Sequence, residues 1–428
     1  MTTTIEEMPL QTEINSPAST PTHAAPQVPA RVRILRAQAE LDSIHDAWSR
    51  LSEHPHSHPD FFRAVVETSP NIRHPFVLVI ERGGEITSML IGRLDDFQLD
   101  VRIGYAKLPR PRVRALVFIY GGLLGNPSAD DCALMVDAVN KALAKGEASL
   151  AMFNHLRTDS PLYPLLATRP SSLVRDHSPS LATHRRVTTC EGTEEFWKRL
   201  PYKSRGNLRW NVKSFLKPFD GKFTIDCFTE PSQVDEMVEK TETVAAKTYQ
   251  RSLGVGFSSS DAEITRMRLK AEKGWLRNYL LSVEGTPVAF LCGTSLNGTY
   301  HADHMGFDPE FRRYSAGIFL TIRVIEEFCE SKGSNRICAV DFGLGDARYK
   351  AEICNESWED ACVYLFAPTV SGIMLNAYRT PALILDQTAR KLLDPQQQEK
   401  IKRFWRKLVQ KKNSDSKTAE KKSSEPSE

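Results

Sequence analysis

The sequence lacks the features that define several common classes of protein. It has no apolar run close to the ~18 uninterrupted residues of a membrane-spanning helix. Its start carries Glu6 and Glu7 and then Thr, Ser and Pro, without the basic residues and apolar stretch of a secretory signal. Its eight cysteines stand singly, and no C-x-x-C pair of a zinc or redox site occurs. We therefore expect a cytoplasmic protein in a reducing compartment, without a metal.

An excess of either charge is missing as well. The chain has 56 basic and 53 acidic residues and a net charge of +3. This balance argues against a general nucleic-acid binder, so no DNA partner is expected and any basic function must be local. With 41% hydrophobic and 25% charged residues, the 428-residue chain has the composition of a globular protein of two or three domains.

Two hairpins form a weak internal repeat. The first, 74–92, has an apolar strand on each side of Gly83-Gly84, and the second, 276–293, has the same arrangement around Glu284-Gly285. Both end on a glycine. The repeat predicts two similarly built lobes.

The region after the second hairpin reads as a compact α/β unit. A strand is predicted at 299–305, a helix at 316–331, and further strands at 336–342 and 363–366. The helix has an apolar stripe at steps of three and four, formed by Ile318, Ile322, Ile325 and Phe328. Such a stripe is typical of a helix packed on a sheet.

The segment 311–318 joins the strand to that helix. Its small residues let a ligand approach the backbone, where the first helical turn offers unpaired N–H groups and the positive end of the dipole. Arg312 and Arg313 would add two guanidinium groups. The pattern favours a diphosphate site, and the alternative is an ordinary strand-to-helix turn with solvated arginines.

Five spaced motifs lie within roughly 195–365. They are Gly274-Trp275-Leu276, Val288-Ala289-Phe290, the segment 307–311, Tyr314-Ser315-Ala316-Gly317, and 341–346 followed by Tyr349-Lys350. Together they resemble the GNAT acyltransferase superfamily, in its CelD-like and FemAB-like branch. The resemblance implies an α/β protein of tandem GNAT-like lobes, each a mixed twisted sheet flanked by helices. The expected limits are a disordered tail at 1–30, a degenerate lobe at 31–190, the catalytic lobe at 191–370, C-terminal helices at 371–410 and a second disordered tail at 411–428.

The resemblance also implies a donor. The donor would be acyl-CoA, with acetyl-CoA first, and the chain has one glycine where the superfamily's diphosphate loop has two. FemAB-type relatives use aminoacyl-tRNA instead, so that donor stays an alternative. The residues that match the loop are Arg312, Arg313, Ser315, Ala316, Gly317 and Ile318.

Transfer to an amine needs a base and a group that stabilises negative charge. Asp303 and His304, with His301, lie on the strand before the loop; on a regular strand His301 and Asp303 share one face and His304 the other. Asp341 and Lys350 match the family's "DF..G...YK" ending, and we expect both to act in catalysis without contributing to stability. The alternatives are a polar strand face satisfied by its neighbours, and a Lys350 paired with Asp346.

Basic residues upstream are candidates for acceptor binding. A helix is predicted at 201–215, with Arg205, Arg209 and Lys213 as a basic stripe, and a polar stretch follows at 247–256. From these two segments the predicted substrate-binding residues are Arg205, Arg209, Lys213, Tyr249 and Arg251. His54, His56 and His58 are interpreted as a solvated loop, because they lack matching carboxylate or cysteine ligands.

The expected function is acyl-CoA-dependent N-acylation of a small or lipid-linked amine, and the resemblance implies a cell-envelope or polysaccharide pathway. Alternatives are aminoacyl transfer from tRNA and a catalytically silent module that binds anions. At the C-terminus, 400–409 combines aromatic and basic residues. Two interpretations stay open for it, weak salt-sensitive contact with an anionic membrane and a helix packed on the second lobe.

Overall fold

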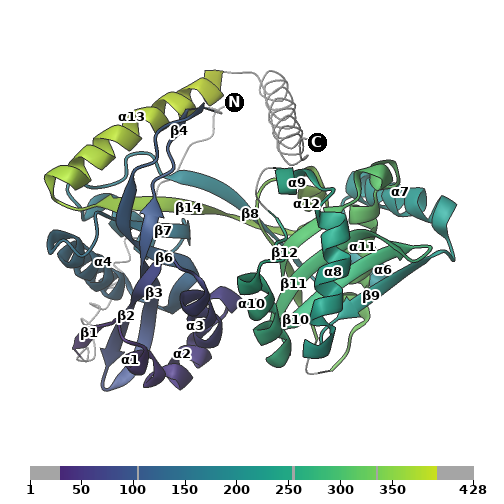
Figure 1. The fold of residues 1–428 in the computed structure, drawn as a ribbon, viewed down its shortest axis with the longest axis horizontal. Coiled ribbons are helices and arrows are strands. Elements are labelled where there is room, and N and C mark those ends of the chain that lie inside the picture. Colours follow the sequence, from purple (N-terminus) through teal and green to yellow (C-terminus); the bar gives the residue numbers. More distant parts are fainter. Residues whose placement is uncertain (1–28, 104–105, 253–255, 334–335, 393–428) are drawn as a thin grey trace, which may run out of the picture.

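The computed structural model describes residues 29–103, 106–252, 256–333 and 336–392. Within them, twelve strands form a single sheet in the order β1-β2-β3-β6-β7-β14-β8-β13-β12-β11-β10-β9. Figure 1 shows this sheet running through two lobes, with helices on both faces of each. The predicted fold class, an α/β protein of two sheet-and-helix lobes, is confirmed.

The first half of the chain supplies the elements of the N-terminal lobe. They are β1 (Ala30–Leu35), α1 (Gln38–Asp42), α2 (His45–Leu51), the 3-10 helix η1 (Pro55–Ser57), α3 (Pro59–Thr68), β2 (Ile72–Arg82), β3 (Glu85–Gln98), β4 (Arg102–Ile103), β5 (Ala106–Lys107), β6 (Arg112–Gly125), α4 (Ala129–Ala144), β7 (Leu150–Arg157), α5 (Leu162–Thr168) and β8 (Ser180–Thr188). Strands β4 and β5 pair only with each other.

The second half repeats the pattern. Its elements are α6 (Thr193–Arg199), α7 (Tyr202–Phe219), β9 (Phe223–Phe228), η2 (Pro231–Gln233), α8 (Val234–Ala245), α9 (Tyr249–Ser252), α10 (Asp261–Glu272), β10 (Leu276–Val283), β11 (Thr286–Leu296), β12 (Thr299–Phe307), η3 (Pro309–Tyr314), α11 (Ala316–Glu330), β13 (Ala339–Leu344), α12 (Arg348–Ile353), β14 (Glu356–Phe366) and α13 (Val370–Leu392). Among the described helices, none is both long and apolar enough to cross a membrane.

The two lobes exchange their last strands. Strand β8 ends the first half of the chain, yet it pairs with β13 of the second half. Strand β14 ends the second half, yet it pairs with β7 of the first. The exchanged strands also pair with each other, so they join the two lobes into one sheet. A boundary near residue 190 therefore divides the sequence into two halves, but each lobe contains one strand from the other half.

Each strand of the core packs a different helix layer on each face. In β2, Phe76, Leu78 and Ile80 pack toward α4 and α5, while Val77 and Val79 pack toward α1, α2 and α3. In the other lobe α6, α7 and α11 cover one face of the sheet, and α8 and α10 cover the other. This explains the near-continuous apolar runs of the two hairpins, because strands buried on both faces lose their polar alternation.

The predicted elements are confirmed with small shifts in their limits. Both hairpins form, and the predicted helices correspond to α7 and α11. Strand β13 starts at Ala339, three residues later than predicted, and β14 starts at Glu356, seven residues earlier. The C-terminal region begins with α13. The predicted tails, apart from residues 29–30, and the basic segment 400–409 lie outside the described residues.

Candidate active site

Strands β12 and β13 separate at the centre of the sheet. They pair in parallel from Thr299 and Ala339 as far as His301 and Asp341, and no further. Beyond that point β12 stays paired with β11, while β13 returns to β8 at Leu344. The facing edges of the two strands beyond the divergence therefore share no ladder. On β13, Lys350 and Asp341 already bind the carbonyls of Phe342 and Leu344 and the N–H of Gly343, so a ligand can satisfy the backbone groups that these contacts leave.

A β-bulge turns three polar side chains of β12 toward the same side. The register with β11 shifts between Cys292, which pairs with His304, and Gly293, which pairs with Ala302. Asp303 is thus the extra residue. The bulge reverses the alternation, so His304 joins His301 and Asp303 on one face. The prediction that His304 points to the opposite face is wrong for this reason.

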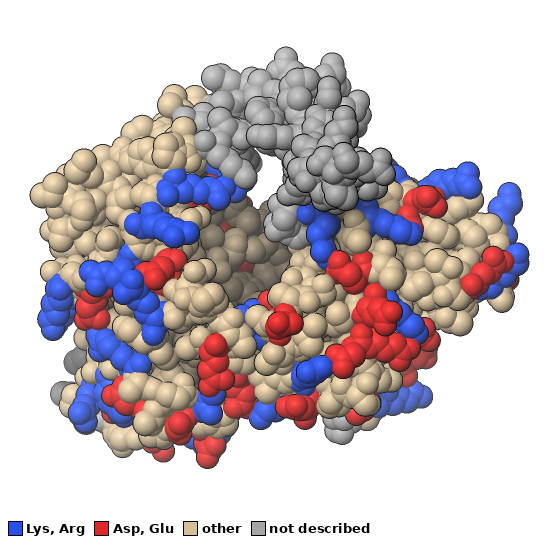
Figure 2. All heavy atoms as spheres, in the orientation of Figure 1, with Lys and Arg blue, Asp and Glu red and all other residues tan. Residues whose placement is uncertain are grey.

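These side chains open into a cavity of about 700 Å³ between the lobes. Figure 2 shows the surface hollowed between them. Strands β12 and β13 form one wall, α10 another, and η1, α3 and β6 of the N-terminal lobe a third. All four predicted catalytic residues line this cavity: Asp303, His304, Asp341 and Lys350.

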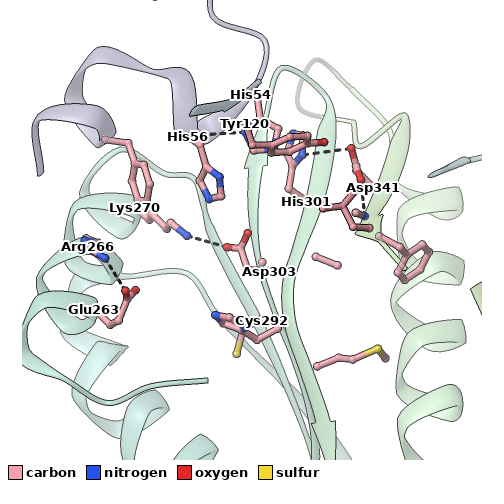
Figure 3. A pocket seen from close by; sticks show the side chains of 18 of the residues that line it. His54, His56, Tyr120, Glu263, Arg266, Lys270, Cys292, His301, Asp303 and Asp341 are labelled. Atoms are coloured by element: carbon pink, nitrogen blue, oxygen red, sulfur yellow. Dashed lines mark hydrogen bonds and ion pairs between the residues drawn. The ribbon is translucent and has the colours of Figure 1, made fainter. Parts of the chain in front are cut away.

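Asp303 forms an ion pair at the centre of the cavity. Its Oδ2 accepts hydrogen bonds from Lys270 Nζ at 2.8 Å and from Thr294 Oγ1 at 2.8 Å. Burial disfavours the carboxylate, but the charges of Lys270 and His56 outweigh it and hold the pKa of Asp303 far below its usual value. Asp303 is therefore a fixed anion that is already hydrogen-bonded, which makes it a poor base. Figure 3 shows Lys270 reaching across to it from α10.

Two imidazoles beside Asp303 are neutral. Burial lowers the pKa of both His301 and His304. His301 is 8% exposed, and neither of its ring nitrogens has a hydrogen-bond partner within the described residues. A neutral imidazole with a free nitrogen can accept a proton.

Asp341 is anchored on the far side of His301. Its Oδ1 accepts hydrogen bonds from His184 Nε2 at 2.6 Å and from the Gly343 N–H at 2.7 Å. Burial opposes ionisation of Asp341, but these hydrogen bonds and the charge of His184 lower its pKa. Its Oδ2 lies 3.8 Å from Nδ1 of His301.

Lys350 occupies the end of the same wall but is bound to the backbone. Its Nζ donates to the carbonyls of Phe342 at 2.6 Å and Leu344 at 2.8 Å. Burial lowers its pKa. The alternative pairing with Asp346 is wrong, because Asp346 pairs with Arg185. Two of the three ammonium protons thus hold the carboxyl end of β13, and one remains for the cavity.

The predicted donor loop lies outside the residues that line the cavity. Arg312 and Arg313 are exposed on η3, and Ser315 has a left-handed backbone with φ of 59°. Ala316 is fully buried, and Ile318 packs against the core. A Cβ atom added to Gly317 would lie 3.1 Å from the ring of Phe307. Gly317 therefore makes room for Phe307 of β12, and the close approach of a ligand at this glycine stays a prediction.

The predicted acceptor residues also lie outside the cavity wall. Arg205, Arg209 and Lys213 belong to α7, where Arg209 lies 5.4 Å from the ring centre of Trp197. The same helix contacts the donor loop, since Ser315 Oγ donates to Asn211 Oδ1 at 2.8 Å. Arg251 is exposed and paired with Glu242 at 2.6 Å. The side chain of Tyr249 lies outside the described part of the structure.

The N-terminal lobe supplies residues that the sequence interpretation missed. His54 and His56 line the cavity, so the prediction of a solvated loop is wrong. The His54 ring centre lies 4.5 Å from that of His301, and burial lowers the pKa of His56 to about 4. Ordered backbone contacts fix η1, including Trp48 Nε1, which donates to the Ser57 carbonyl at 2.6 Å. The first lobe thus forms part of the cavity wall.

Gly121 of β6 makes space for His54. It has φ of +68°, and an added Cβ would lie 2.8 Å from the Cβ of His54. Gly121→Ala is expected to destabilise the fold by about 1–2 kcal/mol through backbone strain, and further by displacing η1. Gly146→Ala is the matched control, because Gly146 has φ of +75° and nothing within 4 Å of an added Cβ. Chemical unfolding measures the difference. Equal losses in the two variants would contradict the close approach.

Comparisons with known proteins give one family match and several similar solved structures. Residues 203–351 match the family model of the acetyltransferase (GNAT) domain. Comparison with curated proteins gives no match. Among solved structures, FemX is 11% identical with a TM-score of 0.48, over 75% of this chain and 95% of that one. L-PGS from Bacillus licheniformis is 12% identical with a TM-score of 0.42, over 78% and 97%.

A tandem GNAT protein from the clavulanic acid biosynthesis pathway is 11% identical with a TM-score of 0.44, over 79% of this chain and 99% of that one. The family match covers α7, the diverging strands β12 and β13, and most of α12. The region 203–351 of the chain thus matches a GNAT acetyltransferase domain.

Proposed function

We propose that the protein transfers an acyl group from acyl-CoA, acetyl-CoA in the first place, to an amine acceptor. The divergence of β12 and β13 beside the cavity is the observation that carries this proposal. An extended thioester arm can lie between the two strands and hydrogen-bond to backbone groups that the divergence leaves available. Its acyl end would then reach the side chains of His301, Asp303 and His304.

The start of α11 is the proposed diphosphate site. The first-turn N–H groups of a helix have no intrahelical acceptor, and they carry the positive end of its dipole. Arg312 and Arg313 are exposed beside this end. The helix packs on β12 through Gly317 and Phe307, so a donor bound at its start lies within reach of the strand divergence.

The proposed chemistry is direct transfer without a covalent intermediate on the protein. The acceptor nitrogen attacks the thioester carbon, the C–S bond breaks, and a neutral imidazole of β12 takes the proton from the nitrogen. Burial keeps His301 and His304 in the form that accepts a proton. The remaining proton of Lys350 can stabilise negative charge that develops at the thioester oxygen.

The acceptor is proposed to be a polar amine of about the size of a sugar. The cavity of about 700 Å³ is lined by imidazole, carboxylate and ammonium groups, which suits a hydroxyl-rich or amino-bearing molecule. An amine linked to a lipid or a polysaccharide of the cell envelope fits the CelD-like and FemAB-like motifs of the sequence.

Calorimetry with CoA and acetyl-CoA tests the donor. We expect binding by the unmodified protein, and at least about tenfold weaker binding by Arg312→Gln/Arg313→Gln, because two charge-assisted contacts to phosphate are lost. Arg268→Gln is the control, since Arg268 is an exposed arginine of α10 that pairs with Asp235 of α8. No heat at millimolar CoA with the unmodified protein would overturn the assignment.

An aminoacyl-tRNA donor is the second candidate, and the surface of α7 favours it. This helix carries five basic residues and no acidic residue. Tyr202 and Trp210 are 86% and 63% exposed on it, so bases could stack beside the positive charges. A thermal-shift comparison of CoA with bulk tRNA separates the two donors, because a ligand that binds only the folded state raises the melting temperature.

A further inference from the structure

Four ionisable side chains form a continuous row behind the cavity. Asp360, His184, Asp341 and His301 come from β14, β8, β13 and β12 in that order. Asp360 Oδ2 lies 2.9 Å from His184 Nδ1, and His184 Nε2 lies 2.6 Å from Asp341 Oδ1. Asp341 Oδ2 then lies 3.8 Å from His301 Nδ1. Only Asp341 and His301 line the cavity, so the other two residues act from outside it.

His184 is fixed in place. It is fully buried, its ring stacks on Trp358 with centres 4.3 Å apart, and the Tyr120 hydroxyl lies 3.3 Å from Nδ1. Each ring nitrogen faces a carboxylate oxygen, and an ionised carboxylate only accepts hydrogen bonds. If both carboxylates are ionised, both nitrogens must donate, which makes His184 an imidazolium between two anions. The hydrogen bonds to the two carboxylates outweigh the effect of burial and raise its pKa, in agreement with the geometry.

The exchanged strands hold this arrangement. His184 lies on β8 and Asp360 on β14, the two strands that the lobes exchange. Asp360 is fully buried, and its Oδ1 has no hydrogen-bond partner within the described residues. A buried carboxylate of this kind is costly unless it serves a paired cation. Its pairing with His184 leaves Asp341 with one oxygen fixed and the other directed toward His301.

We propose that His184, held by Asp360, is a positioning residue that aims Asp341 at His301 and thereby makes His301, not His304, the base for the acceptor. This inference rests on the proposed function. The carboxylates that act on His304 are Asp303 and Glu263, which line the cavity themselves and do not belong to this row. When Nε2 of His301 takes the proton of the attacking nitrogen, Nδ1–H faces Asp341, whose charge stabilises the new imidazolium. The products are the amide, the CoA thiolate and protonated His301, so the step balances.

Other ionisable groups around the row act in both directions. His301 is faced by Asp303 on its own strand, by Arg186 and His184 of β8, and by His54, which directly precedes η1. His184 is faced by Tyr120 of β6 and His155 of β7 besides its two carboxylates. The cation at His184 disfavours protonation of His301, whereas the carboxylate of Asp341 favours it. Removal of the cation should therefore make His301 easier to protonate.

Imidazole NMR of the full-length protein labelled with 15N-histidine tests the row without any substrate. Single substitutions His301→Gln and His184→Gln assign the two signals. In the unmodified protein, His184 is expected to carry protons on both nitrogens across pH 6–9. In His184→Gln, the Gln amide can still donate to Asp341 but carries no charge, so the titration midpoint of His301 is expected to rise by about half a pH unit or more. In Asp360→Asn, His184 itself is expected to titrate within that range.

Asp176→Asn is the matched control. Asp176 is a buried carboxylate paired with Arg379 at 2.7 Å, away from the cavity. It should lower the melting temperature but leave the midpoint of His301 unchanged. A neutral His184 in the unmodified protein, or an unchanged His301 midpoint in both His184→Gln and Asp360→Asn, would overturn the proposal. Failure of CoA binding would instead overturn the proposed donor. The NMR spectra would still test the interaction of His184 with His301, because they need no donor.

Discussion

Asp341→Asn is expected to lower turnover about 100-fold or more. The substitution keeps the shape of the side chain but removes the charge that faces His301 at 3.8 Å. An imidazole without that carboxylate loses both its orientation and the stabilisation of its protonated form, and a positioned acid or base contributes about 10²–10⁴-fold. The effect should fall on turnover, with the affinity for CoA unchanged, because the proposed diphosphate site is at α11.

The same substitution is also expected to destabilise the fold. Asp341 accepts a charge-assisted hydrogen bond from the fully buried His184, and loss of such a bond costs about 1.5–3 kcal/mol. The sequence prediction that Asp341 acts without contributing to stability is therefore not what this geometry favours. Because the pKa of Asp341 is lowered in the folded state, its contribution is present above the ordinary carboxyl pKa and disappears as the pH falls through the lowered value.

Steady-state kinetics and urea unfolding measure both effects. Asp346→Asn is the control, since Asp346 is an exposed carboxylate three residues beyond Gly343 and pairs only at the surface with Arg185. Full activity of Asp341→Asn would exclude Asp341 from the reaction. Loss of stability with unchanged turnover would assign it a structural role alone.

Local signals account for the part of the fold that the sequence predicts well. Gly83-Gly84 and Glu284-Gly285 mark two turns, and apolar runs flank each of them, so the hairpins need no tertiary information. The stripe of α11 from Ile318 to Phe328 repeats with the helical period. The end of β13 is harder to predict from the sequence, because Lys350 fixes it through two carbonyls, and no local pattern reveals these contacts.

The cavity depends on pairings that sequence spacing does not encode. The bulge at Asp303 depends on the register with β11, and a shift by one residue reverses every following side chain. His54 and His301 are far apart in the sequence, and they come into contact only because the two lobes are joined. The strand exchange that brings His184 to Asp341 is equally non-local. Histidines between Pro and Ser look like a solvated loop until the partner lobe covers them.

Lys270→Met is expected to produce the largest loss of stability, about 3–5 kcal/mol at neutral pH. Lys270 and Asp303 are 12% and 21% exposed, and their charged atoms lie 2.8 Å apart. Removal of one partner leaves the other as a buried charge without compensation, and such losses typically have this size. Met retains most of the apolar stem of the side chain, so lost packing contributes little, while the contact of Lys270 Nζ with the Phe61 ring at 5.1 Å is lost together with the charge.

The double variant Lys270→Met/Asp303→Asn separates the ion pair from other effects. It should recover most of the stability, because no uncompensated charge remains, and a double-mutant cycle gives the coupling energy of the pair.

The pH dependence of the stability gives a second check. In the unmodified protein the pKa of Asp303 is lowered, so its stabilising contribution is present above the ordinary carboxyl pKa and is lost as the pH falls through the lowered value. Without Lys270 the carboxyl pKa rises by burial, Asp303 becomes protonated earlier, and the gap between the two proteins narrows as the pH is lowered. Unfolding curves at pH 7 and pH 4 measure this gap. A gap that stays constant with pH, or a double variant no more stable than Lys270→Met, would show that the pair does not determine the stability of the cavity wall.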